Sequence, residues 1–252
     1  MAPLKEPYFF TTREMRHHRF PKATDAYLGL FAQAGNVRWL GEASTAYFWD
    51  EESPGKIQSV SPDARIVISL RDPVARAYSG YWHAVRFAGE TRSFVDVVRE
   101  ESASINHVTR DEVPGYVAAG LYVAGLERYL SRFFDHVLVI FFEDLVADPR
   151  TEIRRIFRFL DIDSGIADSL QLTQRNASAS PRNVIFKRLL AEGQIRALAR
   201  KIVPSRLQPS LSSIAWDSNI SDMDPEARKL LLDVYAGQRP RLEALLGRSL
   251  PW

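Results

Sequence analysis

Two short runs of apolar residues constrain the fold of this chain more strongly than any other feature. They occupy residues 65–70 and 137–142, and their apolar character is continuous rather than alternating. Strands that are covered on both faces have this character, because neither side of the strand meets water. We therefore predict that both runs are parallel strands in the centre of one mostly parallel sheet. A third run, residues 37–42, is interpreted as another strand in the centre of the same sheet.

Between and after these runs, apolar residues recur at helical spacing. Three Asp-Pro pairs, at 72–73, 148–149 and 224–225, place an aspartate where it can cap a helix and a proline at the first helical position. Pro240 interrupts the last helical stretch, which predicts two helices or a kink there. Strands that alternate with helices are typical of an α/β domain, and we expect a single domain over residues 1–252.

Composition excludes several classes of protein. Hydrophobic residues make up 46 % of the chain and charged residues 25 %, which are the values of a globular protein. A net charge of +2 gives no reason to expect a nucleic-acid partner. The absence of cysteine excludes disulfides, thiolate metal sites and a cysteine nucleophile. No apolar run is long enough to span a bilayer, and the first twenty residues lack the apolar core of a secretory signal, so we expect a cytoplasmic protein.

The segment 70–81 carries the clearest chemistry. Arg71 follows the second predicted strand at its carboxyl end, where open α/β sheets bind ligands. The helix that starts after Asp72 offers free N–H groups, and Ser79 shares a face with that start. Arg71 and Ser79 could therefore hold one anion, since a guanidinium fits phosphate oxygens with two parallel bonds. The alternative is that Arg71 and Arg76 form structural ion pairs, with Asp72 as the partner of Arg76.

This segment resembles the second phosphate-binding motif of the sulfotransferases that use 3′-phosphoadenosine 5′-phosphosulfate (PAPS). Further blocks resemble bacterial and heparan-type members of that family, and they occur in the family's order. The blocks are residues 5–10, 41–47, 70–81, 142–149 and 246–252. The resemblance implies a three-layer α/β sulfotransferase fold, similar to that of P-loop NTPases, with a mostly parallel central sheet. It also implies PAPS as the sulfuryl donor, with no metal.

The resemblance assigns roles to individual residues. Arg71 and Ser79 would bind the 3′-phosphate of the nucleotide, and Arg182 would belong to a late basic loop that closes on it. Glu6 would be the base that takes the proton of the acceptor hydroxyl or amine. Because Pro7 follows Glu6, we expect Glu6 to be extended. Without the resemblance, Glu6 beside Lys5 would be interpreted as a solvated ion pair.

One element of the family is missing from the sequence. In family members a strand and a glycine-rich loop with a lysine precede the block at 5–10 and hold the 5′-phosphosulfate, and no such loop occurs in this chain. We therefore expect an N-terminally truncated domain, with Met1 an internal methionine of a longer protein. The alternative is an inactive remnant that binds 3′-phosphoadenosine 5′-phosphate (PAP) weakly. In either case the chain as it stands is expected to transfer no sulfate. A P-loop kinase is disfavoured, since no Walker-type lysine is present.

The acceptor is not specified by these motifs, and a small molecule, a lipid or a carbohydrate each remains open. The aromatic residues of 78–87 either line the acceptor side or pack into the core. His83, in the same stretch, is the next candidate for a base. The basic segment 182–206 is interpreted as a solvated helix face. Oligomeric state is left open.

Overall fold

A computed structural model describes most of the chain. The described residues are 1–11, 21–105, 114–172, 180–181, 216–217 and 222–252. Within them, no helix is both long enough and apolar enough to cross a membrane.

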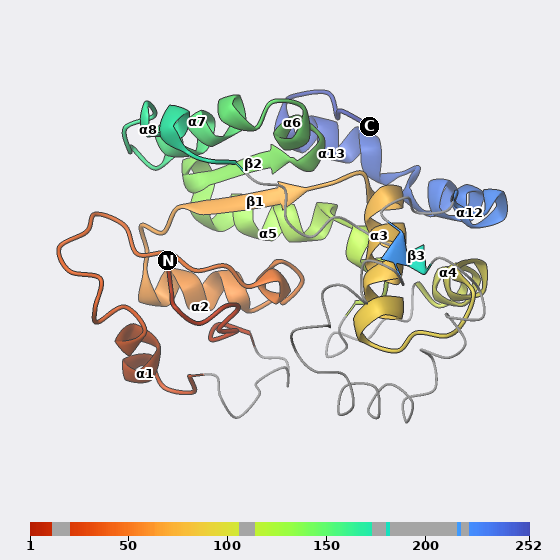
Figure 1. The fold of residues 1–252 in the computed structure, drawn as a ribbon, viewed down its shortest axis with the longest axis horizontal. Helices are drawn as coiled ribbons and strands as arrows, with labels where there is room; N and C mark the ends of the chain where they lie inside the picture. Colours follow the sequence, from red (N-terminus) through yellow and green to blue (C-terminus); the bar gives the residue numbers. More distant parts are fainter. Residues whose placement is uncertain (12–20, 106–113, 173–179, 182–215, 218–221) are drawn as a thin grey trace.

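The two continuous apolar runs form a parallel pair of strands, as predicted. Strand β1 (Ile66–Leu70) lies beside β2 (Val137–Phe141), in a register that pairs Ile66 with Val137 and Leu70 with Phe141. Figure 1 shows helix α5 (Val123–Phe133) on one side of this pair, and α6 (Phe142–Ala147) and α7 (Pro149–Phe159) on the other. Strand β2 is covered on both faces, but Val67 and Ser69 of β1 are exposed, so the prediction of full cover is wrong for β1. In the described residues this sheet has two strands, so neither of them lies at the centre of a larger sheet.

The third predicted strand, residues 37–42, is wrong. This segment is irregular, and the side chains of Val37 and Leu40 are 50 % and 52 % exposed. Side-chain bonds attach it to the end of α7 and the residues that follow. The Trp39 indole N–H donates to the carbonyl oxygen of Leu160 (2.6 Å), and the Arg38 guanidinium pairs with Asp161. Three apolar residues among Arg38, Gly41 and Glu42 do not make a strand when no neighbouring strand pairs with them. In the described residues, the only other strands are the antiparallel pair β3 (Ser180–Pro181) and β4 (Trp216–Asp217).

The three predicted Asp-Pro caps are confirmed. Asp72 accepts a hydrogen bond from the amide of Val74 (3.0 Å), Asp148 from that of Thr151 (3.1 Å), and Asp224 from that of Glu226 (2.8 Å). They begin helices α3, α7 and α12. The α-helices of the described residues whose bounds have not yet been given are α1 (Thr24–Gly29), α2 (Ser53–Val60), α3 (Pro73–Phe87), α4 (Phe94–Ala103), α8 (Ile166–Ser169), α12 (Pro225–Tyr235) and α13 (Gln238–Leu246).

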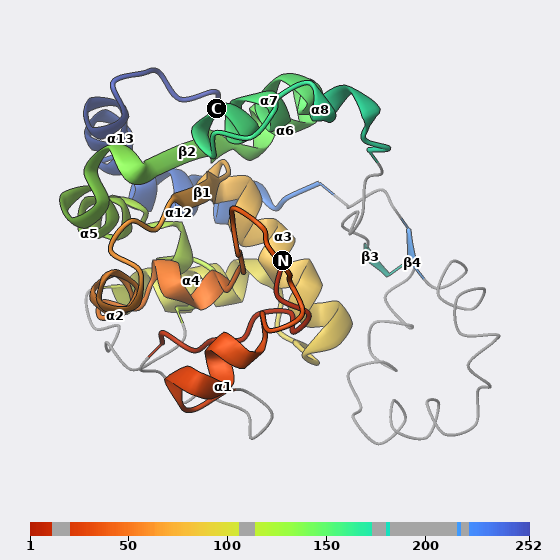
Figure 2. The ribbon, with the colours of Figure 1, turned by 90° about the vertical axis from the view of Figure 1, so that its left-hand side faces the viewer.

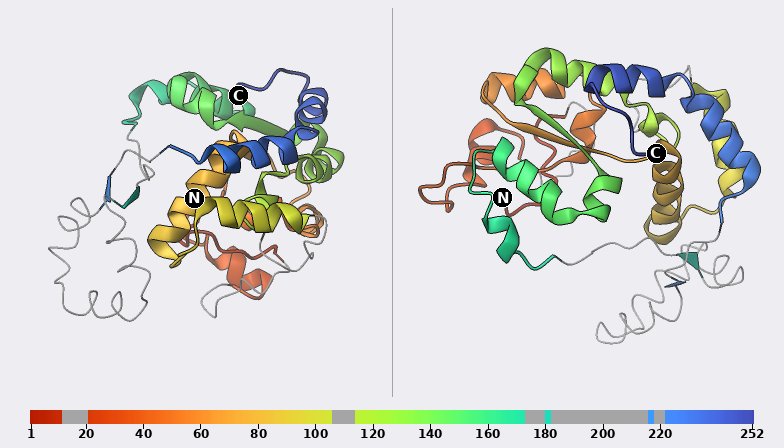
Figure 3. Two further views of the ribbon diagram at one scale, coloured as in Figure 1. Left: turned by 90° about the vertical axis from the view of Figure 1, so that its right-hand side faces the viewer. Right: turned by 90° about the horizontal axis from the view of Figure 1, so that it is seen from above.

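The C-terminal stretch forms two helices, as Pro240 predicted. Helix α12 ends at Tyr235, and Pro240 lies in the first turn of α13, where a proline removes no helical hydrogen bond. Helix α12 packs against α4 and α3, whereas α13 packs against α5 (Figures 2 and 3). The C-terminal helices thus bridge two apolar clusters. One cluster surrounds Leu70 and Phe141 at the sheet, and the other joins α3, α4 and α12.

The turn between α3 and α4 depends on one carboxylate. Glu90 accepts hydrogen bonds from the amides of Thr91 and Arg92, both 2.9 Å, and pairs with the Arg92 guanidinium at 2.7 Å. The bonds from Arg92 lower the pKa of Glu90 from 4.5 to about 2. Because the pKa is lower in the folded state, the stabilisation is present above pH 4.5 and is lost as the pH falls towards 2.

We therefore expect Glu90→Gln to lower the free energy of unfolding at pH 7 by about 1–2 kcal/mol, a value reduced for the exposure of Arg92. Urea unfolding at pH 7 and pH 3 measures this, and the difference between wild type and variant should shrink at pH 3. Glu52→Gln, at an exposed carboxylate of a surface pair, is the matched control. Equal stability of Glu90→Gln and wild type at pH 7 would contradict the prediction.

Candidate functional site

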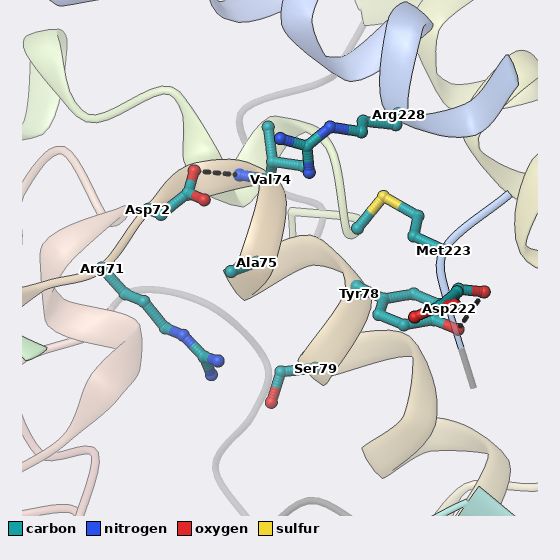
Figure 4. Close-up of a pocket in the computed structure, with 9 residues that line it drawn as sticks. All are labelled: Arg71, Asp72, Val74, Ala75, Tyr78, Ser79, Asp222, Met223 and Arg228. Atoms are coloured by element: carbon teal, nitrogen blue, oxygen red, sulfur yellow. Dashed lines mark hydrogen bonds between the residues drawn. The ribbon is translucent and has the colours of Figure 1, made fainter. Parts of the chain in front are cut away.

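A pocket of about 270 Å³ lies at the start of helix α3, beyond the carboxyl end of β1 (Figure 4). Figure 1 places this helix at the end of the sheet towards which both strand arrows point. The pocket contains both residues that the sequence predicted for an anion site. Its lining consists of Arg71, Asp72, Val74, Ala75, Tyr78, Ser79, Asp222, Met223 and Arg228.

Arg71 follows β1 directly, and its side chain extends from a rigid turn. The amide of Asp72 donates to Glu143 Oε1 (3.0 Å), and the hydroxyl of Tyr122 donates to the carbonyl oxygen of Arg71 (3.0 Å). The Arg71 guanidinium lies 4.7 Å from the ring centroid of Phe142, the first residue of α6. Stacking on a ring leaves the edge N–H groups of a guanidinium free to bind an anion.

The alternative prediction, that Arg71 and Arg76 form structural ion pairs, does not agree with the contacts of the described residues. The guanidinium of Arg71 makes no hydrogen bond or ion pair with any other residue in the described part of the chain. The guanidinium of Arg76 donates to the carbonyl oxygen of Tyr116, while Asp72 caps the helix. Arg71 therefore brings an unneutralised positive charge into the pocket.

Ser79 lies two turns along the helix from Asp72. Figure 4 shows its hydroxyl on the same side of α3 as the guanidinium of Arg71, with both groups directed into the same space. The capping geometry at Asp72 fixes where the helix starts, and the helical repeat then places Ser79 on the pocket face. The pair can bind one anion from two sides, with a charged donor and a neutral one.

Helix α12 supplies the part of the pocket that sequence reasoning missed. Arg228 of α12 and Met223, which precedes that helix, lie across the pocket from Arg71 and Ser79 (Figure 4). Arg228 adds a second positive charge near the first turn of α3. The only local signal for this segment was the cap at Asp224. That cap predicts a helix, but it does not predict that the helix crosses α3.

Glu6 is not among the residues that line this pocket. Its carboxylate accepts one hydrogen bond on each oxygen, from the Tyr8 hydroxyl to Oε2 (2.5 Å) and from Thr45 Oγ1 to Oε1 (3.2 Å). Burial, followed by the bond to Glu6, raises the pKa of Tyr8 to about 12, so this phenol stays protonated and donates at neutral pH. Glu6 is thus bound by hydroxyl groups rather than paired with Lys5.

The prediction that Glu6 is extended is wrong. Its φ is +50° and that of Tyr8 is +49°, so both residues beside Pro7 lie in the left-handed region. The preference that proline imposes on the preceding residue is overcome here by the hydrogen bonds to the carboxylate. Non-glycine residues in this region are strained, and such strain is concentrated at functional sites.

The remaining predicted residues fall into two groups. Arg182 and the whole of the basic segment 182–206 lie outside the described residues. In the aromatic stretch of α3, Tyr81 and Trp82 are buried against Phe94, whereas His83 is exposed and contacts Phe87. Tyr81 and Trp82 are therefore core, whereas Tyr78 lines the pocket and Phe87 is exposed. Within the described residues, no group of histidine, aspartate and glutamate side chains could hold a metal ion.

Comparison with known proteins adds independent information. A sequence profile of the sulfotransferase family matches residues 9–165. Mouse heparan sulfate glucosamine 3-O-sulfotransferase 3B1 is 30 % identical over 165 residues, which cover 65 % of this chain and 40 % of the mouse protein. Mouse bifunctional heparan sulfate N-deacetylase/N-sulfotransferase 4 is 27 % identical over 252 residues, which cover 93 % of this chain and 26 % of that protein. This chain thus spans less than half the length of these relatives.

A solved structure agrees with the sequence relatives. The crystal structure of a sulfotransferase from Alicyclobacillus acidocaldarius superposes with a TM-score of 0.68 at 29 % sequence identity. The superposition covers 99 % of this chain and 85 % of the bacterial one. The similarity therefore extends beyond the segment that the family profile matches.

Proposed function

Because this chain belongs to the sulfotransferase family, whose members use PAPS, we propose that it transfers a sulfuryl group from PAPS to a hydroxyl or amine. The observation that carries the proposal is the pocket that brings Arg71 and Ser79 together where β1 leads into α3. This is the place where open α/β sheets bind nucleotides.

We propose that Arg71 and Ser79 bind the 3′-phosphate of the nucleotide. A phosphate carries about two negative charges, and the pocket offers two guanidinium groups, those of Arg71 and Arg228, beside the positive end of the α3 dipole. The lining also contains the carboxylates of Asp72 and Asp222, so the attraction for a phosphate rests on the Arg71 guanidinium, which has no ion-pair partner in the described part of the chain. By resemblance to the family, Arg182 would join this site from the late loop.

We propose that Glu6 acts as the base. The acceptor oxygen or nitrogen forms a bond to sulfur while the bond from sulfur to the bridging oxygen of the phosphosulfate breaks, and PAP leaves. The acceptor's proton goes to the Glu6 carboxylate, which the hydroxyls of Tyr8 and Thr45 orient. Sulfuryl transfer is an in-line displacement, so this fixed orientation lowers the barrier by positioning.

The class of acceptor is proposed from the relatives. The two mouse relatives are named for heparan sulfate, one for 3-O-sulfation of glucosamine and one for N-sulfation. An amino-sugar oligosaccharide is therefore the first acceptor to test, ahead of small phenols and lipids.

Incubation with [³⁵S]PAPS and a panel of amino-sugar, phenol and lipid acceptors tests the proposal. The 252-residue chain and, where upstream coding sequence exists, a longer form are assayed in parallel, with PAP binding measured by calorimetry. Labelled product from either form supports the transferase. PAP binding without transfer by either form favours the alternative, a protein that holds the nucleotide without catalysis. Absence of both would contradict both functions.

A further inference from the structure

A second carboxylate lies in the same hydrogen-bond network as Glu6. Glu42 Oε2 accepts a hydrogen bond from Ser44 Oγ at 2.9 Å. The hydroxyls of Tyr47 and Tyr27, both of which are buried side chains, also act on Glu42 and lower the pKa of its carboxyl. None of the functions proposed above uses Glu42.

Ser44 connects this carboxylate to the strained turn that carries Glu6. The backbone amide of Tyr8 donates to Ser44 Oγ at 3.2 Å. A serine hydroxyl has one proton and two acceptor lone pairs. When that proton is donated to Glu42, the lone pairs of Ser44 are free to accept the Tyr8 amide. Glu42 therefore determines which way the Ser44 hydroxyl faces.

The network contacts Glu6 through Thr45 and Tyr8, each of which is linked to Ser44. Thr45, next to Ser44, donates to Glu6 Oε1, and Tyr8, whose amide Ser44 accepts, donates its hydroxyl to Glu6 Oε2. Left-handed backbone at Glu6 and Tyr8 persists only where surrounding contacts impose it. The Ser44 bond is such a contact, because it acts on the backbone of one of these two residues.

Electrostatics argue against a purely packing role for Glu42. Burial raises the pKa of this carboxyl and the negative charge of Glu6 raises it further, while the hydroxyls of Tyr47, Ser44 and Tyr27 lower it. A second acidic side chain facing Glu6 is therefore unfavourable on its own account. A neutral side chain would fill the same space without this repulsion, but a hydrocarbon would accept no bond from Ser44.

We propose that Glu42 is a positioning residue for the base. By accepting the Ser44 proton it turns the Ser44 hydroxyl to receive the Tyr8 amide, and so keeps the Glu6 carboxylate in one orientation. The proposal rests on the function proposed for Glu6. It does not require Glu42 to touch either substrate.

Two variants separate positioning from packing and charge. Glu42→Ala removes the acceptor, so we expect kcat to fall about tenfold, the scale of one lost hydrogen bond, with the Kd for PAP unchanged. Glu42→Gln keeps an acceptor oxygen, so we expect kcat within about threefold of wild type. Glu52→Gln, at an exposed carboxylate paired with Lys56, is the matched control and should change nothing.

Hydrogen exchange at the Tyr8 amide provides a readout that needs no turnover. We expect exchange about tenfold faster in Glu42→Ala than in wild type, and no change in Glu52→Gln. Unchanged exchange or unchanged kcat in Glu42→Ala would overturn the proposal. A Glu42→Gln variant as slow as Glu42→Ala would also overturn it, since the charge would then matter rather than the bond to Ser44.

These outcomes are distinguishable from failure of the proposed function. If neither the 252-residue chain nor a longer form transfers sulfate to any acceptor, the transferase function is contradicted, and the positioning role falls with it whatever the exchange shows. If wild type is active and Glu42→Ala is equally active, only the present inference fails.

Discussion

Replacing Glu6 with glutamine is expected to lower the rate of sulfuryl transfer by at least about two orders of magnitude, the contribution of a well-placed general base. Glutamine keeps the shape of the side chain and can still accept from one of the two hydroxyls with its amide oxygen, but it cannot take the acceptor's proton. The loss should fall on kcat, because Glu6 does not line the pocket proposed for the nucleotide. Steady-state kinetics with [³⁵S]PAPS, in a form of the protein that transfers sulfate, measures it.

Affinity for PAP is the internal control for this variant. Calorimetry should give the same Kd for wild type and Glu6→Gln, which shows that the fold and the pocket are intact. A Glu6→Gln variant within a few-fold of the wild-type rate would exclude Glu6 as the base. The next candidate would then be His83, which is exposed on α3.

Replacing Arg71 with alanine is expected to weaken PAP binding by about 2 kcal/mol or more, roughly 30-fold, the scale of a lost charge-assisted hydrogen bond. The guanidinium has no ion-pair partner in the described part of the chain, so its removal should leave the fold largely unaffected. Arg71→Lys keeps the charge but loses the two parallel bonds, so its affinity for PAP should lie between those of wild type and Arg71→Ala. Calorimetric titration with PAP measures all three.

Arg158→Ala is the matched control for Arg71→Ala. Arg158 is an exposed arginine of α7 that does not line the pocket, so its removal changes the net charge by the same amount. We expect its affinity for PAP to stay at the wild-type value. An equal loss in both arginine variants would mean that overall charge, rather than a phosphate contact, explains the effect.

Sequence reasoning was sufficient for those parts of the fold that local pattern specifies. The strands at 66–70 and 137–141 pair in parallel, as their apolar sequences predict, and the Asp-Pro pairs cap helices by bonds within three residues. Residues 37–42 show the limit of this reasoning. A run with strand-like residues becomes a strand only when a neighbour pairs with it, and pairing depends on the tertiary arrangement. The prediction of one domain stays untested.

In the candidate site, too, residues placed by local pattern were predictable, and residues placed by the tertiary arrangement were not. Arg71 and Ser79 were predictable, because a strand, a capped turn and a helix fix their relation over nine residues. Arg228 was not, because its place depends on how α12 crosses α3. The conformation of Glu6 was predicted wrongly from its proline neighbour, since contacts with Thr45, distant in sequence, contribute to the observed one.

The most direct test of the nucleotide site is a calorimetric comparison of PAP with adenosine 5′-monophosphate, which lacks only the 3′-phosphate. If Arg71 and Ser79 bind that phosphate, wild type should prefer PAP by at least about 30-fold. Arg71→Ala should lose most of this preference while its affinity for adenosine 5′-monophosphate stays unchanged. Equal affinity of wild type for the two nucleotides, or a preference that survives intact in Arg71→Ala, would contradict the assignment.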